Sequence, residues 1–235
     1  MNKISFLIPA YNCEKSINDT VRAAIDAISK LQYNIEIIIV DDFSCDSTLE
    51  KIKKIKKKYD FVKIIKNSKN LGFALSILKT LDYVTGDYIK ALHAGNIEKS
   101  NQILSLLKAI NQNDFILTDP VDNRSFFRRN LSRICSKILC IVSNKNIKYF
   151  NSGLVCKTNL FKKFYTEGNL YGNFTISLLV AKLLIFKYKY VEVKVNYRHP
   201  IKSSNSLKFS NLLSFISVIM IILKVRLKKY FFNYK

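Results

Sequence analysis

Two adjacent acids, Asp41 and Asp42, follow a nearly continuous apolar run at residues 35–40. The run is rich in β-branched residues and predicts a strand buried on both faces, as in a parallel sheet covered by helices. Ligands of open α/β sheets bind just outside the carboxyl ends of the strands, so paired carboxylates at this point indicate a ligand site. The alternative is that the two acids only end the strand and begin a turn.

A second polar segment, residues 9–12 (Pro-Ala-Tyr-Asn), follows a shorter apolar run at residues 3–8. We expect this strand to stop at Pro9 and the loop after it to lie on the same edge as Asp41. No G-x-G-x-x-G follows a predicted strand, which argues against a dinucleotide-dependent dehydrogenase. The absence of G-x-x-x-x-G-K-[ST] likewise excludes a P-loop nucleotide hydrolase.

Four arginines fall within ten positions of the second half and are interleaved with Phe126, Phe127 and Leu131. Guanidinium groups bind phosphate oxygens in a bidentate manner, so the segment indicates a helix that handles phosphate. A solvated basic surface is the alternative. The four are Arg124, Arg128, Arg129 and Arg133.

The pattern of the first half predicts alternating strands and helices that would position these residues. The Ser47 and Glu50 spacing is that of a capping box, which predicts a helix start beside the paired acids. Three strand–helix repeats indicate a parallel sheet with right-handed crossovers. The predicted helices cover residues 16–30, 49–59, 73–84, 99–111 and 172–186, and further strands cover residues 61–66, 88–92, 114–118 and 190–197, with another beginning near residue 154.

The C-terminal segment is apolar and then basic and aromatic. Residues 209–223 carry no charge and would form a helix of about 22 Å, shorter than the roughly 30 Å hydrocarbon core of a bilayer. Cations and aromatic rings follow, a combination typical of an element lying in a membrane interface. A helix packed on the domain and a dimer contact are the alternatives. The following residues are Lys224, Arg226, Lys228, Lys229, Tyr230, Phe231, Phe232 and Tyr234.

The composition is strongly basic, with 39 Lys and Arg against 17 Asp and Glu and a formal charge of +22. Such an excess predicts an anionic partner: nucleic acid, a phosphorylated substrate or an acidic lipid surface. No RNA-binding aromatic motif or zinc knuckle accompanies the charge, so we expect no nucleic acid. Five cysteines without a C-x-x-C pair, and no secretion signal at the N-terminus, favour a cytoplasmic protein.

Four ordered blocks resemble family-2 glycosyltransferases, which have the glycosyltransferase-A fold. They are residues 6–12 (FLIPAYN), 36–44 (EIIIVDDFS), 70–72 with Ala74 and Leu75, and 86–89 (GDYI). The resemblance covers about residues 3–200 and is greatest to the polyprenyl-phosphate branch, similar to dolichyl-phosphate mannose synthase. It implies one Rossmann-like α/β domain with a mostly parallel sheet flanked by helices, and the residue pattern adds the C-terminal apolar and basic helix. We divide the chain into a domain at residues 1–206, with a nucleotide-sugar half (1–97) and an acceptor half (98–206), and a tail at residues 207–235.

This resemblance implies a site for a nucleotide-diphosphate sugar. Asp42 would accept a hydrogen bond from the base, with Asp41 beside it, and Asn70 and Gly72 would form the floor. The arginine helix and Arg198 would face the phosphate of an acceptor. The remaining expected donor-site residues are Pro9, Ala10, Tyr11, Glu14, His93, Gly95 and Asn96.

One block departs from the family. The family carries an Asp-x-Asp that binds Mg²⁺ or Mn²⁺ after the fourth strand, but residues 92–96 here read Leu-His-Ala-Gly-Asn, so Gly95 replaces the essential acid. His93 and Asn96 are poor substitutes, because hard divalent cations prefer carboxylate oxygens. Three alternatives follow: transfer without metal, with Lys or Arg neutralising the diphosphate; a metal held weakly by other groups; or loss of transfer.

We therefore expect an inverting glycosyltransferase that acts on a lipid-linked (polyprenyl phosphate) or cell-surface glycan acceptor, in the cytoplasm at the inner face of the membrane. An anionic membrane surface is an expected partner. A lipid phosphate is already ionised and needs no base, whereas a sugar hydroxyl would make Asp119 or Asp122 candidates for general base. The alternative is a degenerate domain that binds a nucleotide sugar or a partner enzyme without transfer.

Overall fold

The computed structural model of the chain describes residues 2–120, 126–151, 153–165, 172–196 and 209–232. Its first half alternates strands and helices as expected. The elements are β1 (Lys3–Ala10), α1 (Ile17–Ile28), β2 (Asn34–Asp41), α2 (Thr48–Lys58), β3 (Val62–Lys66), α3 (Gly72–Thr80), the 3-10 helix η1 (Leu81–Tyr83) and β4 (Tyr88–Ala91).

The second half is richer in helix. It comprises α4 (Ser100–Lys108), the 3-10 helix η2 (Ile110–Gln112), β5 (Phe115–Pro120), α5 (Phe126–Ser143), β6 (Leu154–Lys157), α6 (Thr158–Phe164), η4 (Gly172–Phe174), α7 (Thr175–Ile185), β7 (Tyr190–Val195) and α8 (Phe209–Phe232).

Within the described residues the strands form one seven-stranded sheet in the order β3-β2-β1-β4-β6-β5-β7. β1, β2, β3 and β4 pair in parallel, and β5 pairs in parallel with β7. β6 alone is antiparallel to both of its neighbours, so β5 regains the direction of β4. The predicted α/β fold with a mostly parallel sheet is confirmed.

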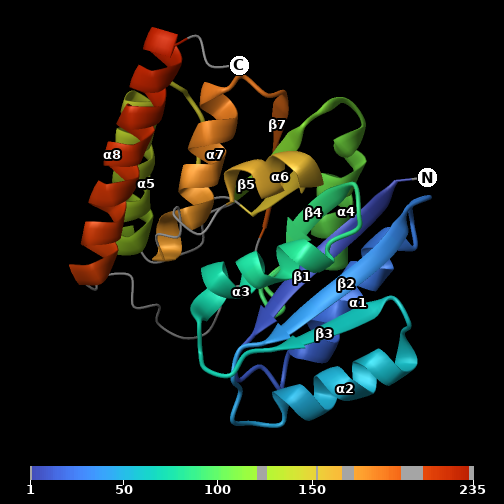
Figure 1. Cartoon of the computed structure of the whole chain (residues 1–235). Helices are drawn as coiled ribbons and strands as arrows, with labels where there is room; N and C mark the ends of the chain where they lie inside the picture. Colours follow the sequence, from blue (N-terminus) through green and yellow to red (C-terminus); the bar gives the residue numbers. More distant parts are fainter. Residues whose placement is uncertain (1, 121–125, 152, 166–171, 197–208, 233–235) are drawn as a thin grey trace.

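Helices cover both faces of the sheet (Figure 1). On one face, side chains such as Phe6 and Ile39 pack with α1, α2 and α4. On the other face, side chains such as Leu7 and Ile38 pack with α3, α5, α6, α7 and α8. Because alternate residues of a strand point to opposite faces, the apolar run of β2 supplies both cores, as the prediction of a doubly buried strand requires.

The prediction that β1 stops at Pro9 is wrong, because the strand runs on to Ala10. The backbone groups of Leu7 face β4, since its carbonyl accepts a hydrogen bond from the Leu92 N–H. Pro9, two residues later, faces the same side, where β4 has already ended at Ala91. The missing N–H of proline therefore interrupts no ladder hydrogen bond.

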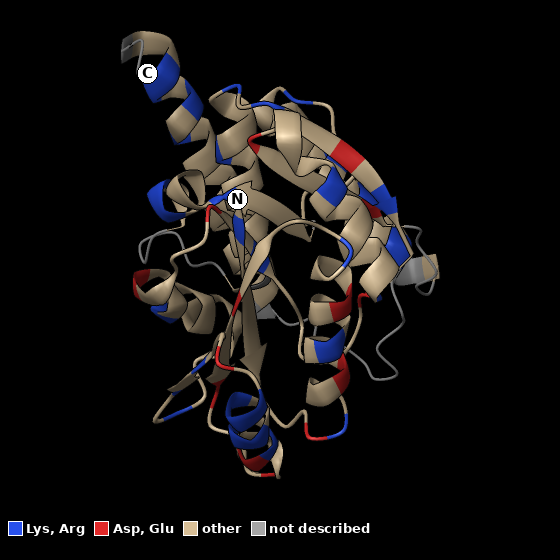
Figure 2. Ribbon diagram, turned by 90° about the vertical axis from the view of Figure 1, so that its right-hand side faces the viewer, with Lys and Arg blue, Asp and Glu red and all other residues tan. Residues whose placement is uncertain are grey.

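Two other local predictions need correction. α2 begins where expected, but the Ser47 side chain makes no capping bond; Asp46 Oδ1 accepts from the Thr48 N–H at 2.9 Å instead. The short helix α6 was not predicted. The lysine face of α2 is solvated, as expected, and Figure 2 shows Lys and Arg along this helix and at the C-terminal end of α8.

The C-terminal segment forms one continuous helix, α8, that lies beside α5 and α7 (Figure 1). Phe215, Val218 and Ile222 are buried in the core against these helices. Packing on the domain, one of the three alternatives, is thus confirmed for this face. Among the described helices, α8 included, none combines the length and the apolar content that crossing a membrane requires.

Candidate functional site

The paired acids and the Pro-Ala-Tyr segment share one edge of the sheet. Ala10 and Asp41 are register partners at the ends of β1 and β2, and the Asp42 N–H donates to the Ala10 carbonyl at 2.8 Å. The edge continues along the ends of β3 and β4 (Figure 1). We call the carboxyl ends of β1, β2, β3 and β4, with the loops that follow them, the donor edge.

Asp42 is buried, with 3% of its surface exposed, and its carboxylate binds the protein itself. Oδ1 accepts hydrogen bonds from Asn67 Nδ2 at 2.7 Å and the Leu71 N–H at 2.8 Å. Oδ2 accepts from the Gly72 N–H at 2.8 Å, where α3 begins. A carboxylate at a helix N-terminus satisfies free N–H groups and interacts favourably with the helix dipole. Asp42 therefore anchors the floor of the donor edge.

Asp41 differs from its neighbour. It is fully buried, its Oδ1 is 3.4 Å from the Ser44 N–H, and its Oδ2 has no hydrogen-bond partner among the described residues. A buried carboxylate oxygen without a donor is costly, since such groups are normally paired. This oxygen is the acceptor at the donor edge that a ligand donor or a water molecule would satisfy.

Hydrogen bonds tie the loops after β1 and β2 together. The Asn12 N–H donates to Ser44 Oγ at 3.2 Å, and Asn12 Oδ1 accepts from the Cys45 N–H at 3.0 Å. Glu14, expected at the donor, accepts from the Ser47 N–H at 3.1 Å at the start of α2. The two loops thus behave as one unit, and the Glu14 carboxylate is engaged in holding them.

Residues with a left-handed backbone gather at the donor edge. Asn12 (φ 50°), Phe43 (φ 67°), Gly72 (φ 78°) and Asn96 (φ 52°) follow β1, β2, β3 and β4 in turn. A positive φ is unfavourable for phenylalanine in particular, and such strain clusters at functional sites. The Phe43 side chain is 54% exposed in the loop after β2, and Tyr11 is 48% exposed in the loop after β1. Two aromatic surfaces therefore face solvent at this edge.

The segment at the degenerate motif is held by α1. The Ala94 carbonyl accepts from Ser16 Oγ at 2.8 Å and Thr20 Oγ1 at 2.9 Å, and the Asn96 N–H donates to Thr20 Oγ1 at 3.0 Å. The His93 ring stacks on Phe73, with the ring centroids 4.5 Å apart. Desolvation lowers the pKa of His93, although the residue as a whole is exposed. A lowered pKa favours the neutral form of the imidazole.

A buried ion pair lies next to this segment. Lys90 of β4 is fully buried, and its Nζ donates to Glu98 Oε1 at 2.9 Å. Glu98 Oε2 is buried without a hydrogen-bond partner in the described part of the chain. The pair links β4 to Glu98, two residues before α4, and so closes the loop that carries His93, Gly95 and Asn96.

The residues at the motif do not fit a divalent cation. Among the described residues no three His, Cys, Asp or Glu side chains gather closely enough to hold a metal. A neutral imidazole and an amide are weak ligands for Mg²⁺ or Mn²⁺. Gly95 leaves room for an acid, however: its φ lies outside the left-handed region, and an added Cβ would meet only Ile97 Cγ1 at 4.0 Å.

Among the remaining expected site residues, Asn70 is exposed and its Oδ1 accepts from the Gly72 N–H at 3.1 Å. Asp119 is the penultimate residue of β5, at the same edge of the sheet, and its Oδ2 pairs with Lys148 Nζ at 2.6 Å. Arg129 and Arg133 lie on α5, the former half-buried and the latter exposed. The Arg128 side chain, Asp122, Arg124 and Arg198 lie outside the described residues.

Our interpretation of the sequence missed Asn67 and the Lys90–Glu98 pair. Asn67 Nδ2 bridges Asp42 and Ser76 Oγ, and its N–H donates to the Asp41 carbonyl. A polar residue directly after an apolar strand was the available signal for Asn67. Lys90 carried a signal too, since a lysine inside a short apolar strand needs a partner.

Solved structures define the class of protein by its fold. Glucosyl-3-phosphoglycerate synthase from Mycobacterium tuberculosis, solved with phosphoglyceric acid, matches with a TM-score of 0.67 at 15% identity, over 95% of this chain and 80% of that one. Staphylococcus aureus TarS 1–349 matches with a TM-score of 0.64 at 16% identity, over 98% of this chain and 73% of that one. The chain has the glycosyltransferase-A fold.

The family follows from the sequence. Residues 5–190 match glycosyl transferase family 2, and the chain belongs to this family, as the ordered blocks predicted. Dolichol-phosphate mannosyltransferase of Pyrococcus furiosus is 25% identical over 232 residues, which cover 94% of this chain and 64% of that protein. Undecaprenyl-phosphate 4-deoxy-4-formamido-L-arabinose transferase of Salmonella choleraesuis is 28% identical over 143 residues, covering 59% and 43%. The chain spans less than two thirds of the length of either relative.

Proposed function

We propose that this chain transfers a sugar from a nucleotide-diphosphate donor to an acceptor that carries a lipid phosphate or a glycan. The observation that carries the proposal is the shared edge, where Ala10 pairs with Asp41 beside two exposed aromatic rings. Its support from other proteins is the family, and structural neighbours solved with UDP and Mn²⁺ or with UDP-GlcNAc.

Different residues of the donor edge would bind different parts of the donor. The exposed rings of Tyr11 and Phe43 provide apolar faces for a nucleotide base. The unpaired Oδ2 of Asp41 would accept an N–H from uracil or guanine once the strained loop at Phe43 opens. Asp42 would hold the floor of the site without touching the donor, which revises its expected role.

The diphosphate requires stabilisation as negative charge develops on departure. Because Gly95 stands where the family has an acid, we expect hydrogen-bond donors and cations of the chain to supply it. Arg129 on α5 is a candidate, since its Nε is buried without a hydrogen-bond partner among the described residues. An acceptor lipid phosphate would attack as an anion without a base. For a sugar hydroxyl, Asp119 would first have to leave Lys148.

Release of nucleotide diphosphate from a panel of UDP- and GDP-sugars, with and without EDTA, tests the proposal. We expect release with at least one donor and loss of donor binding in Tyr11→Ala and Phe43→Ala, with Tyr83→Ala as an exposed aromatic control distant from the donor edge. Absence of both binding and release for every donor would overturn it.

A second candidate is a domain that binds the donor but does not transfer, and the observation in its favour is Gly95 in the degenerate motif. Calorimetric donor binding without turnover, not rescued by Gly95→Asp, would establish it. Rescue by that single change would show instead that the site lacks only the carboxylate.

We also propose a cytoplasmic location at the inner face of the membrane and a role in building a surface polysaccharide or lipopolysaccharide. Two relatives are named for transfer to dolichol phosphate and undecaprenyl phosphate, which are lipids. The formal charge of +22 suits an anionic surface. Flotation of the chain with liposomes tests this setting.

A further inference from the structure

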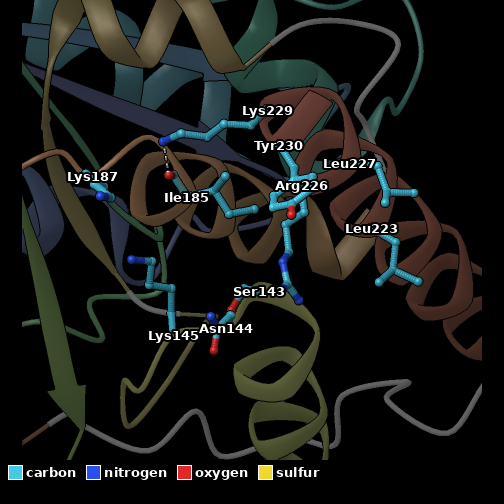
Figure 3. A pocket seen from close by; sticks show the side chains of 10 residues that line it. All are labelled: Ser143, Asn144, Lys145, Ile185, Lys187, Leu223, Arg226, Leu227, Lys229 and Tyr230. Atoms are coloured by element: carbon cyan, nitrogen blue, oxygen red, sulfur yellow. Dashed lines mark hydrogen bonds between the residues drawn. The ribbon is translucent and has the colours of Figure 1, made fainter. Parts of the chain in front are cut away.

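A pocket of about 890 Å³ lies at the C-terminal ends of three helices (Figure 3). α5 and α7 end there, and the last turns of α8 form the remaining wall. The N-terminal half of α8 instead meets η4, where the rings of Phe215 and Phe174 lie 5.0 Å apart. η4 also contacts α3 and so lies toward the donor edge. The pocket is therefore not part of the site described above.

Four of the ten residues that line this pocket are cations, and none of the ten is acidic. Arg226 Nη1 donates to the Val142 carbonyl and Lys229 Nζ to the Ile185 carbonyl, so these two cap the ends of α5 and α7. Each helix end carries about half a negative charge. The three helix ends together offset roughly one and a half of the four positive charges, so about two and a half stay uncompensated.

The other two cations, Lys145 and Lys187, form no ion pair within the described residues. Lys187 follows the end of α7 with φ 60°, and Lys145 follows Asn144, whose φ is 52° at the end of α5. Both positions are thus set by the way the helices end. Desolvation lowers the pKa of Lys229, and repulsion from Lys187 and Lys145 lowers it further. The three ammonium groups repel one another across a space that an anion would fill.

An exposed apolar stripe of α8 runs into the pocket. Its members recur at alternating steps of three and four residues, which places them on one side of the helix, and each is between 39% and 83% exposed. The opposite side packs on α5 and α7. Three members, Leu223, Leu227 and Tyr230, also line the pocket. The stripe comprises Leu213, Ile216, Met220, Leu223, Leu227 and Tyr230.

We propose that the pocket binds the phosphate of an anionic phospholipid, with the apolar stripe of α8 against the acyl chains beside it, so that α8 docks the protein on an anionic leaflet. The inference rests on the proposed function only for the membrane setting. It adds the docking element and a phosphate site separate from the donor edge.

Charge decides between a lipid surface and a second copy of the chain. α5 and α8 carry four cations each and no acid. A second copy seated on this stripe would bring like charges together, whereas an anionic leaflet neutralises them, with each lysine near the surface strengthening binding about fivefold. An apolar helix face flanked by lysine and arginine is the pattern of helices that lie in a membrane interface.

Flotation of the full chain with vesicles tests the proposal. We expect binding to phosphatidylcholine mixed with phosphatidylglycerol and little binding to phosphatidylcholine alone. The pocket variant Lys145→Gln/Lys187→Gln should weaken binding roughly 30-fold, because it removes two cations. The stripe variant Leu223→Ser/Leu227→Ser should weaken it by about tenfold for each leucine. Neither variant changes a residue of the buried core.

Lys53→Gln/Lys57→Gln on the exposed face of α2 is the matched control, since it removes the same charge elsewhere. If the pocket and control variants lost vesicle binding equally, net charge alone would explain the loss and the phosphate site would be overturned. If the pocket bound inorganic phosphate but the protein did not float with vesicles, the pocket would be a site for a soluble anion and the docking proposal would fall. A dimer in light scattering that the stripe variant dissociates, again without flotation, would assign a second copy.

Donor binding by the same protein samples separates this inference from the proposed function. We expect the pocket variant to bind the donor as the unchanged chain does while losing the vesicles. If the unchanged protein bound vesicles but no donor, the docking surface would be supported, and only the proposed glycosyl transfer would be contradicted.

Discussion

Replacing Asp42 tests whether this carboxylate is a structural anchor or a ligand. Asp42→Asn keeps the shape of the side chain but replaces one acceptor oxygen with an NH₂ group. Because Asn67 Nδ2, the Leu71 N–H and the Gly72 N–H all donate to this carboxylate, at least one donor then faces another donor. Asp42→Ala removes the acceptor of all three.

The cost follows from these contacts. An unsatisfied buried donor costs about 1–3 kcal/mol, and loss of the charge at the start of α3 adds about 0.3–1 kcal/mol. We therefore expect Asp42→Asn to lower the free energy of unfolding by about 1–4 kcal/mol, and Asp42→Ala by more. The exposed acid Asp82 provides the control, because Asp82→Asn should change stability by less than about 0.5 kcal/mol.

Urea unfolding and donor calorimetry together decide the role. We expect Asp42→Asn to lose stability and to bind the donor in proportion to what stays folded. Asp41→Asn should do the reverse, since its Oδ2 has no partner among the described residues and its Oδ1 contact is long, at 3.4 Å. If Asp42→Asn were as stable as the unchanged chain but bound no donor, our assignment of the two acids would be refuted.

Three further predictions concern the degenerate motif and two buried carboxylates. Gly95→Asp should fold normally, and its affinity for the donor should be roughly 5–150-fold higher with Mn²⁺ than with EDTA, as measured by calorimetry. The same affinity in both conditions would contradict this prediction. Lys90→Met should cost about 3–5 kcal/mol in urea unfolding by leaving the Glu98 carboxylate buried alone, and Lys90→Met/Glu98→Leu should recover much of this; equal stability of both variants would argue against the pair. Burial alone would raise the pKa of Glu36, but hydrogen bonds from Lys63, Ser5 and Thr85 outweigh it and lower the pKa from 4.5 to about 2. The carboxylate therefore adds about 3 kcal/mol of stability above pH 4.5, and this contribution is lost as the pH falls toward 2. In urea unfolding, the free energies of unfolding of the unchanged chain and of Glu36→Gln should therefore approach each other over this range. A difference that grew as the pH fell would contradict the prediction.

The donor edge could be predicted from the sequence because the features that determine it are local. The run that forms β2 is apolar at every position from Ile37 to Val40, and helices on both sides explain that pattern directly. Parallel strands joined by helices must end on one edge, so placing Ala10 near Asp41 required no knowledge of side-chain packing. The same logic brought Asp119 to this side of the sheet.

The second half was harder because its elements depend on tertiary contacts. β6 has four residues and α6 has seven, lengths at which propensity and periodicity carry little information. The antiparallel direction of β6 is stabilised by its pairing with β4 and β5, which lie far away in sequence. The direction of a side chain is equally invisible: Asp41 and Asp42 are adjacent acids, yet one caps α3 and the other does not.

The sequence blocks shared with the family contain residues needed for packing and residues needed for binding, and the structure distinguishes the two kinds. At Gly86 an added Cβ would lie 2.5 Å from Ser5 Oγ and 2.8 Å from the Lys3 carbonyl, so only glycine lets the chain approach β1 here. Asp87 then accepts from the Lys3 N–H at 2.8 Å. The Gly-Asp block is thus explained by packing at the amino ends of the strands, opposite the donor edge. Phe43 lies at the donor edge with a positive φ of 67°, which is unfavourable for its side chain, and such strain is typical of functional sites.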